Sequence, residues 1–552
     1  TGVTKYGDCG ATLFMANKSL NGKLIGLHRA GCDGASLCAI VTRQWIRNII
    51  QNPQALLEIG EDIKPEAVMD KHATIKHDET IQLWETARID AQTGLLMVGI
   101  LDKAVFNPTS TRIRRTGILL DTRTAYEPSI MSPTDPRAQG FQPMEEGLRR
   151  YGASYLEEEI DEMEVFEAAD EIGNECANEI QKRNKTVRVF SNTEVLNTPP
   201  ILEYCNAKPL DRTGSPGFPH IVNNAGVSKG DYLYQNQKDG RWYVKPQNME
   251  LLNNVHQILN DAAQGIEHMH PLVAYCKDEP LKLKKIYEVK KTRLFFSCPF
   301  EYLICFRRFF NAAMYRVQEL YHILPPKIGI NGQNFADWHT MTSRLERVGP
   351  RGFASDVESF DASVPKIFVQ ACTRIWNQIY SRCSKEGEDV AKANKIRETL
   401  HKAIEGAYVI NRKRIFKLSQ AQVSGNPATA IENSFVIWML YYLVWKRLAT
   451  QHAPELASYT NFRKNVELIC YGDDNLCTVS NEASWFNFNS FAKEAKRFGF
   501  KITDAAKKGG DVPDFQTLEE MDFLKRGFKK INQLAVGPLD HASITKSCEW
   551  IR

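Results

Sequence analysis

One segment limits the possible folds more than any other, because it combines a predicted hairpin with two adjacent acids at its tip. Residues 466–479 read VELICYGDDNLCTV, with apolar residues on both sides of a glycine turn. The pattern predicts a strand, a tight turn at Gly472 and Asp473, and a second strand. Adjacent carboxylates at Asp473 and Asp474 repel each other, and the repulsion grows as solvent is excluded. A divalent cation would neutralise both acids, and hard oxygen ligands favour Mg²⁺ or Mn²⁺. Two solvated acids on an ordinary hairpin are the simpler alternative.

A third acid for such a site is predicted at the end of an upstream strand. In RGFASDVESFDASVP, a short apolar strand ends at Asp356, and Asp361 follows five residues later after a turn. A strand end beside the hairpin would deliver Asp356 as the third metal ligand. Two ions held in this way could activate a 3′-hydroxyl, stabilise a leaving pyrophosphate and clamp an in-line phosphoryl transfer. The acids therefore predict a nucleotidyl transferase.

Small polar residues lie between these two acidic segments. In QVSGNPATAIENSFVIWM, Ser424 and Gly425 belong to a flexible loop, and Thr429 and Asn433 share one face of the helix that follows. Hydroxyl and amide groups beside Asp361 could hydrogen-bond a ribose 2′-hydroxyl. Taken alone, Ser-Gly before an apolar helix also fits an ordinary helix N-cap.

The bulk properties describe a large globular protein. A chain of 552 residues with 43% hydrophobic and 25% charged residues predicts two or more domains. The apolar run 435–445 is about half the length of a membrane span, so it predicts a buried helix. The thirteen cysteines are scattered without a CxxC pair, which favours reduced thiols in a cytosolic setting. Residues 277–293 hold seven basic residues against three acidic ones, which fits either a phosphate-binding wall or a charged surface hairpin.

Taken in order, these motifs resemble a viral RNA-dependent RNA polymerase of the positive-strand, picornavirus-like group, on its dicistrovirus and marnavirus side. The chain shows D-x4-D, S-G-x3-T-x3-N-S and Y-G-D-D in sequence, then F-L-K-R at 523–526, which resembles a primer-grip hairpin. Upstream, TGSPGFP at 213–219 resembles a template-guiding loop, and the basic block ending in KKTR resembles an element over the incoming triphosphate. The segment 499–509 resembles the one that carries a lysine acting as general acid.

The resemblance implies an α+β fold, a right hand of fingers, palm and thumb, over residues 96–552. Because the chain stops soon after the primer-grip element, a truncated thumb is expected. Asp356 and Asp473 would bind Mg²⁺ or Mn²⁺ with support from Asp474, and Lys507 would be the general acid. The other implied site residues are ribose-sensing Asp361, Ser424 and Asn433 with Thr429 as their buttress, triphosphate-binding Lys282, Lys291 and Arg293, and Lys525 near the primer strand.

Residues 1–50 resemble the C-terminal part of a chymotrypsin-like viral cysteine protease. Cys9 in G-D-C-G would be the nucleophile, and His28 in G-L-H would line a glutamine-reading pocket with Thr4. No first barrel precedes residue 1, so this portion is expected to be incomplete and inactive as a hydrolase. Residues 51–95 are predicted as a junction, in which Gln51, Gln54 and Gln92 are candidate cleavage positions.

Two other functions remain open at this point. A reverse transcriptase shares the palm and the acid pair, although the polar side chains of Asp361 and Asn433 favour a ribose. An inactive polyprotein fragment that only binds RNA is the alternative from another class. The resemblance further implies an RNA template and primer, NTPs, a small protein primer and other viral replication proteins as partners, without a transmembrane segment. It places the protein in the host cytoplasm at membrane-associated replication complexes.

Overall fold

The structure, a computed structural model, describes residues 80–116, 118, 124–152, 159–222, 226–418, 420, 422–505 and 512–552 and three earlier strands. The chain divides into two compact units, Thr1–Asp70 and Lys71–Arg552. In the first unit, β1 (Thr12–Phe14), β2 (Leu24–Cys32) and β3 (Ala35–Ile40) form an antiparallel sheet in the order β1-β2-β3. His28 lies in β2, whereas Thr4 and Cys9 lie outside the described residues.

A four-stranded antiparallel sheet carries the predicted hairpin in the second unit. Its order is β16-β17-β13-β18, with bounds Val466–Tyr471, Asp474–Val479, Arg351–Val357 and Ile502–Asp504. Strands β13, β16 and β17 are mostly buried on both faces because helices cover each side, whereas β18 is half-buried. Leu468 and Cys470 belong to the core under α12 (Thr429–His452), while the alternate residue Ile469 packs with the core of α8 (Phe335–Val348).

A second, six-stranded sheet joins segments that are far apart in the sequence. Its order is β12-β10-β14-β15-β5-β4. The bounds are Leu294–Ser297, Leu272–Cys276, Tyr408–Asn411, Arg414–Lys417, Leu96–Leu101 and Ile81–Ile89. Only β10 and β14 pair in parallel; the other neighbours in this sheet are antiparallel. Strand β4 belongs to this sheet. The sheet therefore includes residues 81–89, which lie inside the predicted junction of residues 51–95.

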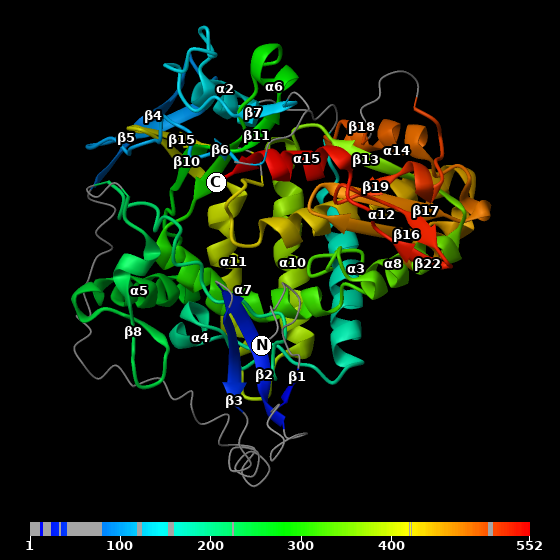
Figure 1. Cartoon of the computed structure of the whole chain (residues 1–552), viewed down its shortest axis with the longest axis horizontal. Coiled ribbons are helices and arrows are strands. Elements are labelled where there is room, and N and C mark those ends of the chain that lie inside the picture. Colours follow the sequence, from blue (N-terminus) through cyan, green and yellow to red (C-terminus); the bar gives the residue numbers. More distant parts are fainter. Residues whose placement is uncertain are drawn as a thin grey trace. The chain divides into compact units, whose positions relative to one another are not determined.

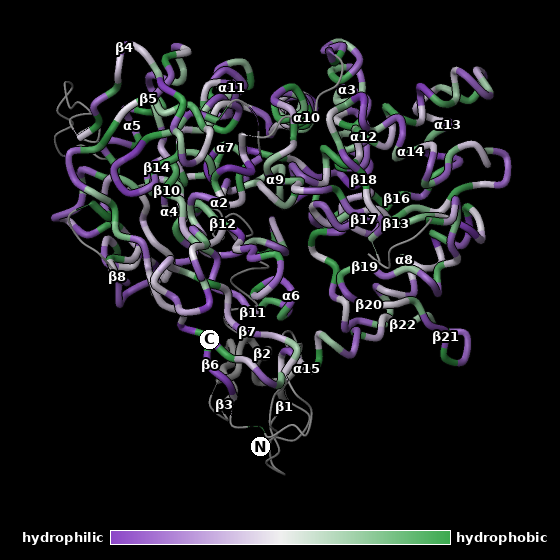
Figure 2. The backbone as a smooth tube through the Cα atoms, turned by 90° about the horizontal axis from the view of Figure 1, so that it is seen from above, coloured by the Kyte–Doolittle hydropathy of each residue, from purple (hydrophilic) through white to green (hydrophobic). Residues whose placement is uncertain are grey.

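Five further long helices contribute buried residues to the main core. They are α3 (Glu162–Gln181), α5 (Glu250–Gln264), α7 (Phe300–Glu319), α10 (Lys366–Cys383) and α11 (Val390–Glu405). The sheet that contains β10 and the sheet that contains β16 lie on opposite sides of α10 in both views (Figures 1 and 2). This arrangement confirms the predicted α+β class.

Helix α3 shows how the sequence builds these elements. Asp161 caps its start by accepting a hydrogen bond from the backbone N–H of Met163 at 2.9 Å. Val165, Ala168, Ile172 and Cys176 follow at helical spacing and are all fully buried. Apolar spacing and the cap therefore make this acidic stretch helical from residue 162, with its apolar face in the core.

The apolar run 435–445 is buried inside α12, as predicted. Among the described residues, no helix combines the length and apolar character that crossing a membrane requires. The remaining elements are short. They are α2 (Pro143–Arg149), α4 (Asn192–Leu196), α6 (Leu283–Tyr287), α9 (Phe360–Ser363), α13 (Tyr459–Asn465), α14 (Phe488–Ala495), α15 (His541–Glu549), β6 (Arg114–Arg115), β7 (Tyr126–Pro128), β8 (Leu233–Gln235), β9 (Trp242–Val244), β11 (Pro280–Lys282), β19 (Asp522–Phe523), β20 (Arg526–Gly527), β21 (Lys529–Ile531), β22 (Leu534–Val536) and β23 (Trp550–Ile551).

Candidate active site

The turn between β16 and β17 carries the paired acids where the sequence predicted them. Gly472 has φ +66° and forms the turn with Asp473, while Asp474 opens β17. The hydroxyl of Ser434 in α12 accepts a hydrogen bond from the backbone N–H of Gly472 at 2.9 Å. The turn is therefore fastened to the helix that passes beneath the sheet.

Strand β13 brings Asp356 to the same end of the sheet. Ser355 pairs with Asn475 across β13 and β17, and extending this antiparallel register by one residue sets Asp356 opposite Asp474. Residues that face each other across two strands project to the same face of the sheet. The sheet thus unites the two acidic segments that the sequence separates by more than a hundred residues.

Asn475 locks this register from inside the core. Its amide nitrogen donates to the carbonyl oxygens of Asp473 (2.7 Å) and Ser355 (3.2 Å). Its amide oxygen accepts from the hydroxyls of Ser355 and Tyr441, both at 2.7 Å. A buried amide with all of these partners is costly to displace, since each lost bond would leave a polar group unpaired. Asn475 therefore holds β13, α12 and the acidic turn together.

Asp474 is tied to the predicted primer-grip hairpin. One of its carboxylate oxygens accepts a hydrogen bond from the backbone N–H of Leu524 at 2.9 Å. Leu524 and Lys525 both have positive φ, +54° and +60°, as the tight turn between β19 and β20 requires. Burial raises the pKa of Asp474 to about 6, against the lowering effects of the Leu524 N–H and of nearby Lys525. Lys525 thus lies beside the acids; its contact with a primer stays a prediction.

Asp361 lies in the short helix α9 and shares the electrostatic environment of the turn. Burial raises its pKa to about 6, and the negative charge of Asp473 acts in the same direction. Arg293, Lys277 and a hydrogen bond from Ser424 act in the opposite direction. The structure therefore brings Asp361, Asp473, Ser424 and Arg293 close together, with Lys277 beside them, and the roles assigned to these residues stay predictions.

The loop that carries Ser424 is held at close quarters to β12. The backbone carbonyl of Ser424 accepts a hydrogen bond from the N–H of Phe296 at 2.8 Å, and Gly425 has φ +132°. The hydroxyl of Thr429 donates a hydrogen bond to the carbonyl of Asn426 at 2.7 Å, and its role as a buttress of the ribose-sensing residues stays a prediction. The amide oxygen of Asn433 is buried without a hydrogen-bond partner among the described residues. Such an orphaned acceptor is a candidate contact for a bound molecule.

The basic block supplies charge from the side of the six-stranded sheet. Arg293 donates two hydrogen bonds to the carboxylate of Glu279, at 2.7 and 2.5 Å, and its own pKa is raised mainly by this contact. Asp361 and Asp473 contribute to the same shift. Lys282 lies in β11, and Lys291 precedes β12. The roles of these two lysines at a triphosphate stay predictions, and Lys507 lies outside the described residues.

Protein side chains alone do not complete a metal centre here. Among the described residues, no group of three or more His, Cys, Asp and Glu side chains is arranged to hold a metal ion. Magnesium is commonly held by one or two carboxylates together with substrate phosphates and water. The donor chemistry of Asp356, Asp473 and Asp474 suits that mode of binding, and a bound cation would offset the burial that raises the pKa of Asp474.

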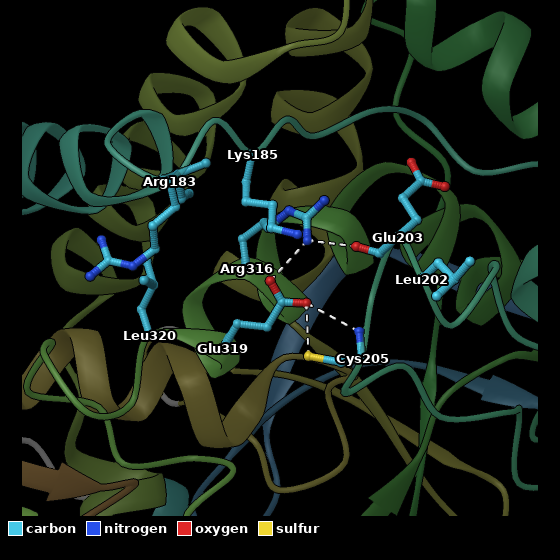
Figure 3. Close-up of a pocket in the computed structure, with 9 residues that line it drawn as sticks. Arg183, Lys185, Leu202, Glu203, Cys205, Arg316, Glu319 and Leu320 are labelled. Carbon is cyan, nitrogen blue, oxygen red and sulfur yellow. Dashed lines mark hydrogen bonds and ion pairs between the residues drawn. The ribbon is translucent and has the colours of Figure 1, made fainter. Parts of the chain in front are cut away.

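A separate pocket of about 210 Å³ lies beside α3 and α7, as the close-up in Figure 3 shows. There Arg316 donates to Glu319 at 2.8 Å, and the thiol of Cys205 donates to the same carboxylate at 3.3 Å. None of the predicted site residues that the structure describes lines this pocket. The candidate active site is therefore the acidic cluster at the sheet end.

Comparison with protein families matches residues 119–552 to the family described as viral RNA-dependent RNA polymerase. The chain belongs to this family. Membership confirms the function class that the order of the motifs predicted, and it gives no support to a reverse transcriptase. A solved Sicinivirus 3Dpol RNA-dependent RNA polymerase shares the fold, with a TM-score of 0.63 and 16% identity over 81% of this chain and 85% of that one. The polymerase therefore has the predicted right-hand fold.

Relatives of this polymerase are parts of viral polyproteins. It is 26% identical to the genome polyprotein of rice tungro spherical virus (strain Vt6) over 99% of its length. It is 28% identical to the RNA1 polyprotein of cowpea mosaic virus and 25% identical to the replicase polyprotein of cricket paralysis virus, over 99% and 100% of its length. The polymerase chain spans only 16%, 28% and 31% of these three polyproteins.

Three residues that contact or act on the candidate site were not predicted from the sequence. Lys277 opens the basic block, Ser434 ends the S-G-x3-T-x3-N-S motif, and Asn475 directly follows the paired acids. Each was visible inside a motif, but its role depends on contacts between separate elements. Only the folded chain shows that Ser434 and Asn475 hold the turn and that Lys277 acts on Asp361.

Proposed function

We propose that this polymerase adds ribonucleotides to the 3′ end of an RNA strand on an RNA template, with Asp356 and Asp473 as ligands of divalent ions and Asp474 in support. The observation that carries the proposal is the register of β13 against β17. It sets Asp356 beside the acidic turn, next to the site that holds Asp361. Carboxylates from separate β-strands then meet where the 3′ end of an RNA strand and a triphosphate could be aligned.

Bound Mg²⁺ or Mn²⁺ would activate the 3′-hydroxyl and stabilise the leaving pyrophosphate. The chain's own residues would orient the reactants and balance the charge. Arg293 and Lys277, which already act electrostatically on Asp361, would attract the negatively charged triphosphate. Lys282 and Lys291 are proposed to extend this contact, Lys525 to lie by the primer, and Lys507 to protonate the leaving group.

The ribose would be recognised by polar groups of the second motif. The pKa of Asp361 is raised to about 6, so at pH 7 most of its carboxylate is ionised and able to accept a hydrogen bond. The orphaned amide oxygen of Asn433 offers a second acceptor, and Ser424 offers a hydroxyl beside Asp361. A 2′-hydroxyl would satisfy such a group, whereas a deoxyribose would leave it unpaired, which is the basis of strong discrimination.

Primer extension with the full chain tests this proposal. The unmodified protein should incorporate ribonucleotides into an annealed RNA primer in the presence of Mg²⁺. The Asp473→Asn variant should lose roughly a thousandfold in rate, because a metal ligand contributes several kcal/mol to transition-state stabilisation. Asp239→Asn, in the exposed turn between β8 and β9, is the matched control and should behave like the unmodified protein. Undiminished incorporation by Asp473→Asn would refute the assignment.

The same assay separates the alternatives. Preferential use of deoxyribonucleotides would favour reverse transcription. Binding of RNA by the unmodified protein without any incorporation would favour a fragment that only binds RNA.

We also propose that residues 1–50 belong to a chymotrypsin-like cysteine protease, with Cys9 as nucleophile and with Thr4 and His28 at the glutamine pocket. Support comes from the G-D-C-G and G-L-H motifs and from polyprotein alignments that cover 99% to 100% of this chain. On the family resemblance, a small protein primer and other replication proteins would be partners, at membrane-associated complexes in the host cytoplasm. Mapping the cut made by the complete protease tests the junction: a cut outside residues 46–95 would overturn it.

A further inference from the structure

A fully buried carboxylate lies one residue before Asn433. Glu432 and His401 have no exposed surface, and one carboxylate oxygen of Glu432 accepts hydrogen bonds from His401 Nε2 and Trp376 Nε1, both at 3.0 Å. These contacts join the first turn of α12 to α11 and α10. A charged group in such a position is costly unless it is paired and hydrogen-bonded, as Glu432 is.

The other carboxylate oxygen of Glu432 holds the loop before α12. It accepts hydrogen bonds from the side-chain amides of Gln422 (2.5 Å) and Asn426 (3.0 Å). These two residues flank Ser424 and Gly425, and both are buried. One carboxylate thus joins the helices beneath the site to both ends of the loop that carries Ser424.

The pair is charged at neutral pH. Burial alone would lower the pKa of His401, but Glu432 and Glu405 outweigh this effect and raise it to about 9. His401 Nδ1 lies 3.4 Å from Glu405, so both ring nitrogens have acidic partners. Burial tends to raise the pKa of Glu432, yet the His401 charge and the hydrogen bonds of Glu432 lower it overall. Imidazolium and carboxylate therefore stabilise each other inside the protein.

From Glu432 the contacts continue to the proposed ribose site. The backbone N–H of Gln422 donates to the carbonyl oxygen of Asp361 at 2.9 Å, so the loop held by Glu432 also holds the main chain of Asp361. Between the two tethers, Ser424 lies close enough to the Asp361 side chain to lower the pKa of its carboxyl group. Displacement of this loop would therefore change the relative position of Ser424 and Asp361.

We propose that Glu432, paired with His401, is a positioning residue for sugar selection, which holds residues 422–426 so that Ser424 and Asp361 meet the ribose of the incoming nucleotide. This inference rests on the proposed function of the same site. Glu432 does not touch the nucleotide; it acts through the loop. A merely structural role would lower stability without changing the preference for ribose over deoxyribose.

The Glu432→Gln variant tests the proposal. Glutamine offers one oxygen and one NH₂ group, so whichever way it turns, its N–H groups face two existing donors. The loss of one or two hydrogen bonds to a charged acceptor should reduce the discrimination between CTP and 2′-deoxy-CTP, measured as the ratio of kcat/KM values, by about tenfold. The amides of residues 422–428 should also exchange faster with deuterium, which is measured without catalysis.

Glu175→Gln is the matched control. Glu175 accepts hydrogen bonds from Tyr459 (2.6 Å) and Arg463 (3.1 Å) and links α3 to α13, away from the loop. It should leave both the discrimination ratio and the exchange of residues 422–428 unchanged. If Glu432→Gln folds poorly, Gln422→Met removes one tether while leaving the His401 pair in place, and it should shift both readouts in the same direction.

The outcomes separate this inference from the function on which it rests. Unchanged discrimination and unchanged loop exchange in Glu432→Gln and Gln422→Met, with normal ribonucleotide incorporation, would overturn the positioning role and leave the polymerase intact. Failure of the unmodified protein to incorporate nucleotides would overturn the proposed function, and the exchange experiment would still decide whether Glu432 holds the loop.

Discussion

Substituting Gly425 by alanine should damage the site more than the stability of the protein. Gly425 has φ +132°, a backbone conformation that other residues rarely adopt, and an added Cβ would lie 1.9 Å from the carbonyl oxygen of Phe296. Real Cβ atoms essentially never approach within 3.0 Å, so the loop must retreat from β12 by about 1.1 Å. The backbone strain alone costs on the order of 1–3 kcal/mol.

The displacement of the loop should lower the activity. It would break or lengthen the 2.8 Å hydrogen bond between the N–H of Phe296 and the carbonyl of Ser424, and it would move Ser424 relative to Asp361. A misplacement of about 1 Å in a positioning group costs on the order of a hundredfold in rate. We therefore expect Gly425→Ala to lower kcat/KM for ribonucleotides about a hundredfold and the free energy of unfolding by about 2 kcal/mol.

Primer extension and chemical denaturation measure the two effects. Gly387→Ala is the control, because Gly387 also has a positive φ, +89°, but an added Cβ would meet no atom within 4 Å. It should lose stability through strain alone and keep its polymerase activity. Equal activity in Gly425→Ala and Gly387→Ala would refute the reasoning that close contact with β12 sets the loop.

Three other predictions follow from charges and hydrogen bonds. The pKa of His401, about 9, lies above its ordinary value of 6.5, so the stabilisation that its charge gives is complete below pH 6.5 and is lost as pH rises through 9. The free energy of unfolding, measured by denaturation at pH 6.5 and 9.5, should differ by roughly 3 kcal/mol. This difference should be smaller in His401→Gln. Ser434→Ala should cost about 1 kcal/mol of stability and slow incorporation, because the Gly472 N–H loses its acceptor; an unchanged unfolding midpoint would contradict this. Arg293→Met should raise KM for nucleotides roughly tenfold. It should also move the acid limb of the pH–rate profile to higher pH, since Asp361 loses a cation that lowers its pKa. An acid limb at unchanged pH would exclude that coupling.

Local patterns predicted much of the site. The glycine turn with its acid pair, the buried helix of residues 435–445 and the F-L-K-R hairpin all form as the sequence indicated. Each depends on interactions between residues close in the chain, which apolar periodicity and turn chemistry report directly. The joint action of Ser424 and Asp361 on a ribose stays a prediction, and the structure places Ser424 close enough to lower the pKa of Asp361.

Other features were beyond local reasoning. The polar segment around β4 showed no clear core face, yet it forms the edge of the six-stranded sheet, because its partner β5 supplies the hydrogen bonds. Glu432 looks like an unfavourable charge in an apolar helix until His401, Trp376, Gln422 and Asn426 are seen around it.

By itself, the sequence determined which chemical groups this polymerase contains and which short helices, strands and turns carry them, since turns, caps and apolar spacing depend on interactions over a few residues. Tertiary structure decided which groups meet. Asp356 reaches the acidic turn only through strand register, and Glu432 is tolerated only because four donors from other parts of the chain surround it. Such contacts join residues 6 to 120 positions apart in the chain, and the cost of an unpaired buried charge selects one arrangement.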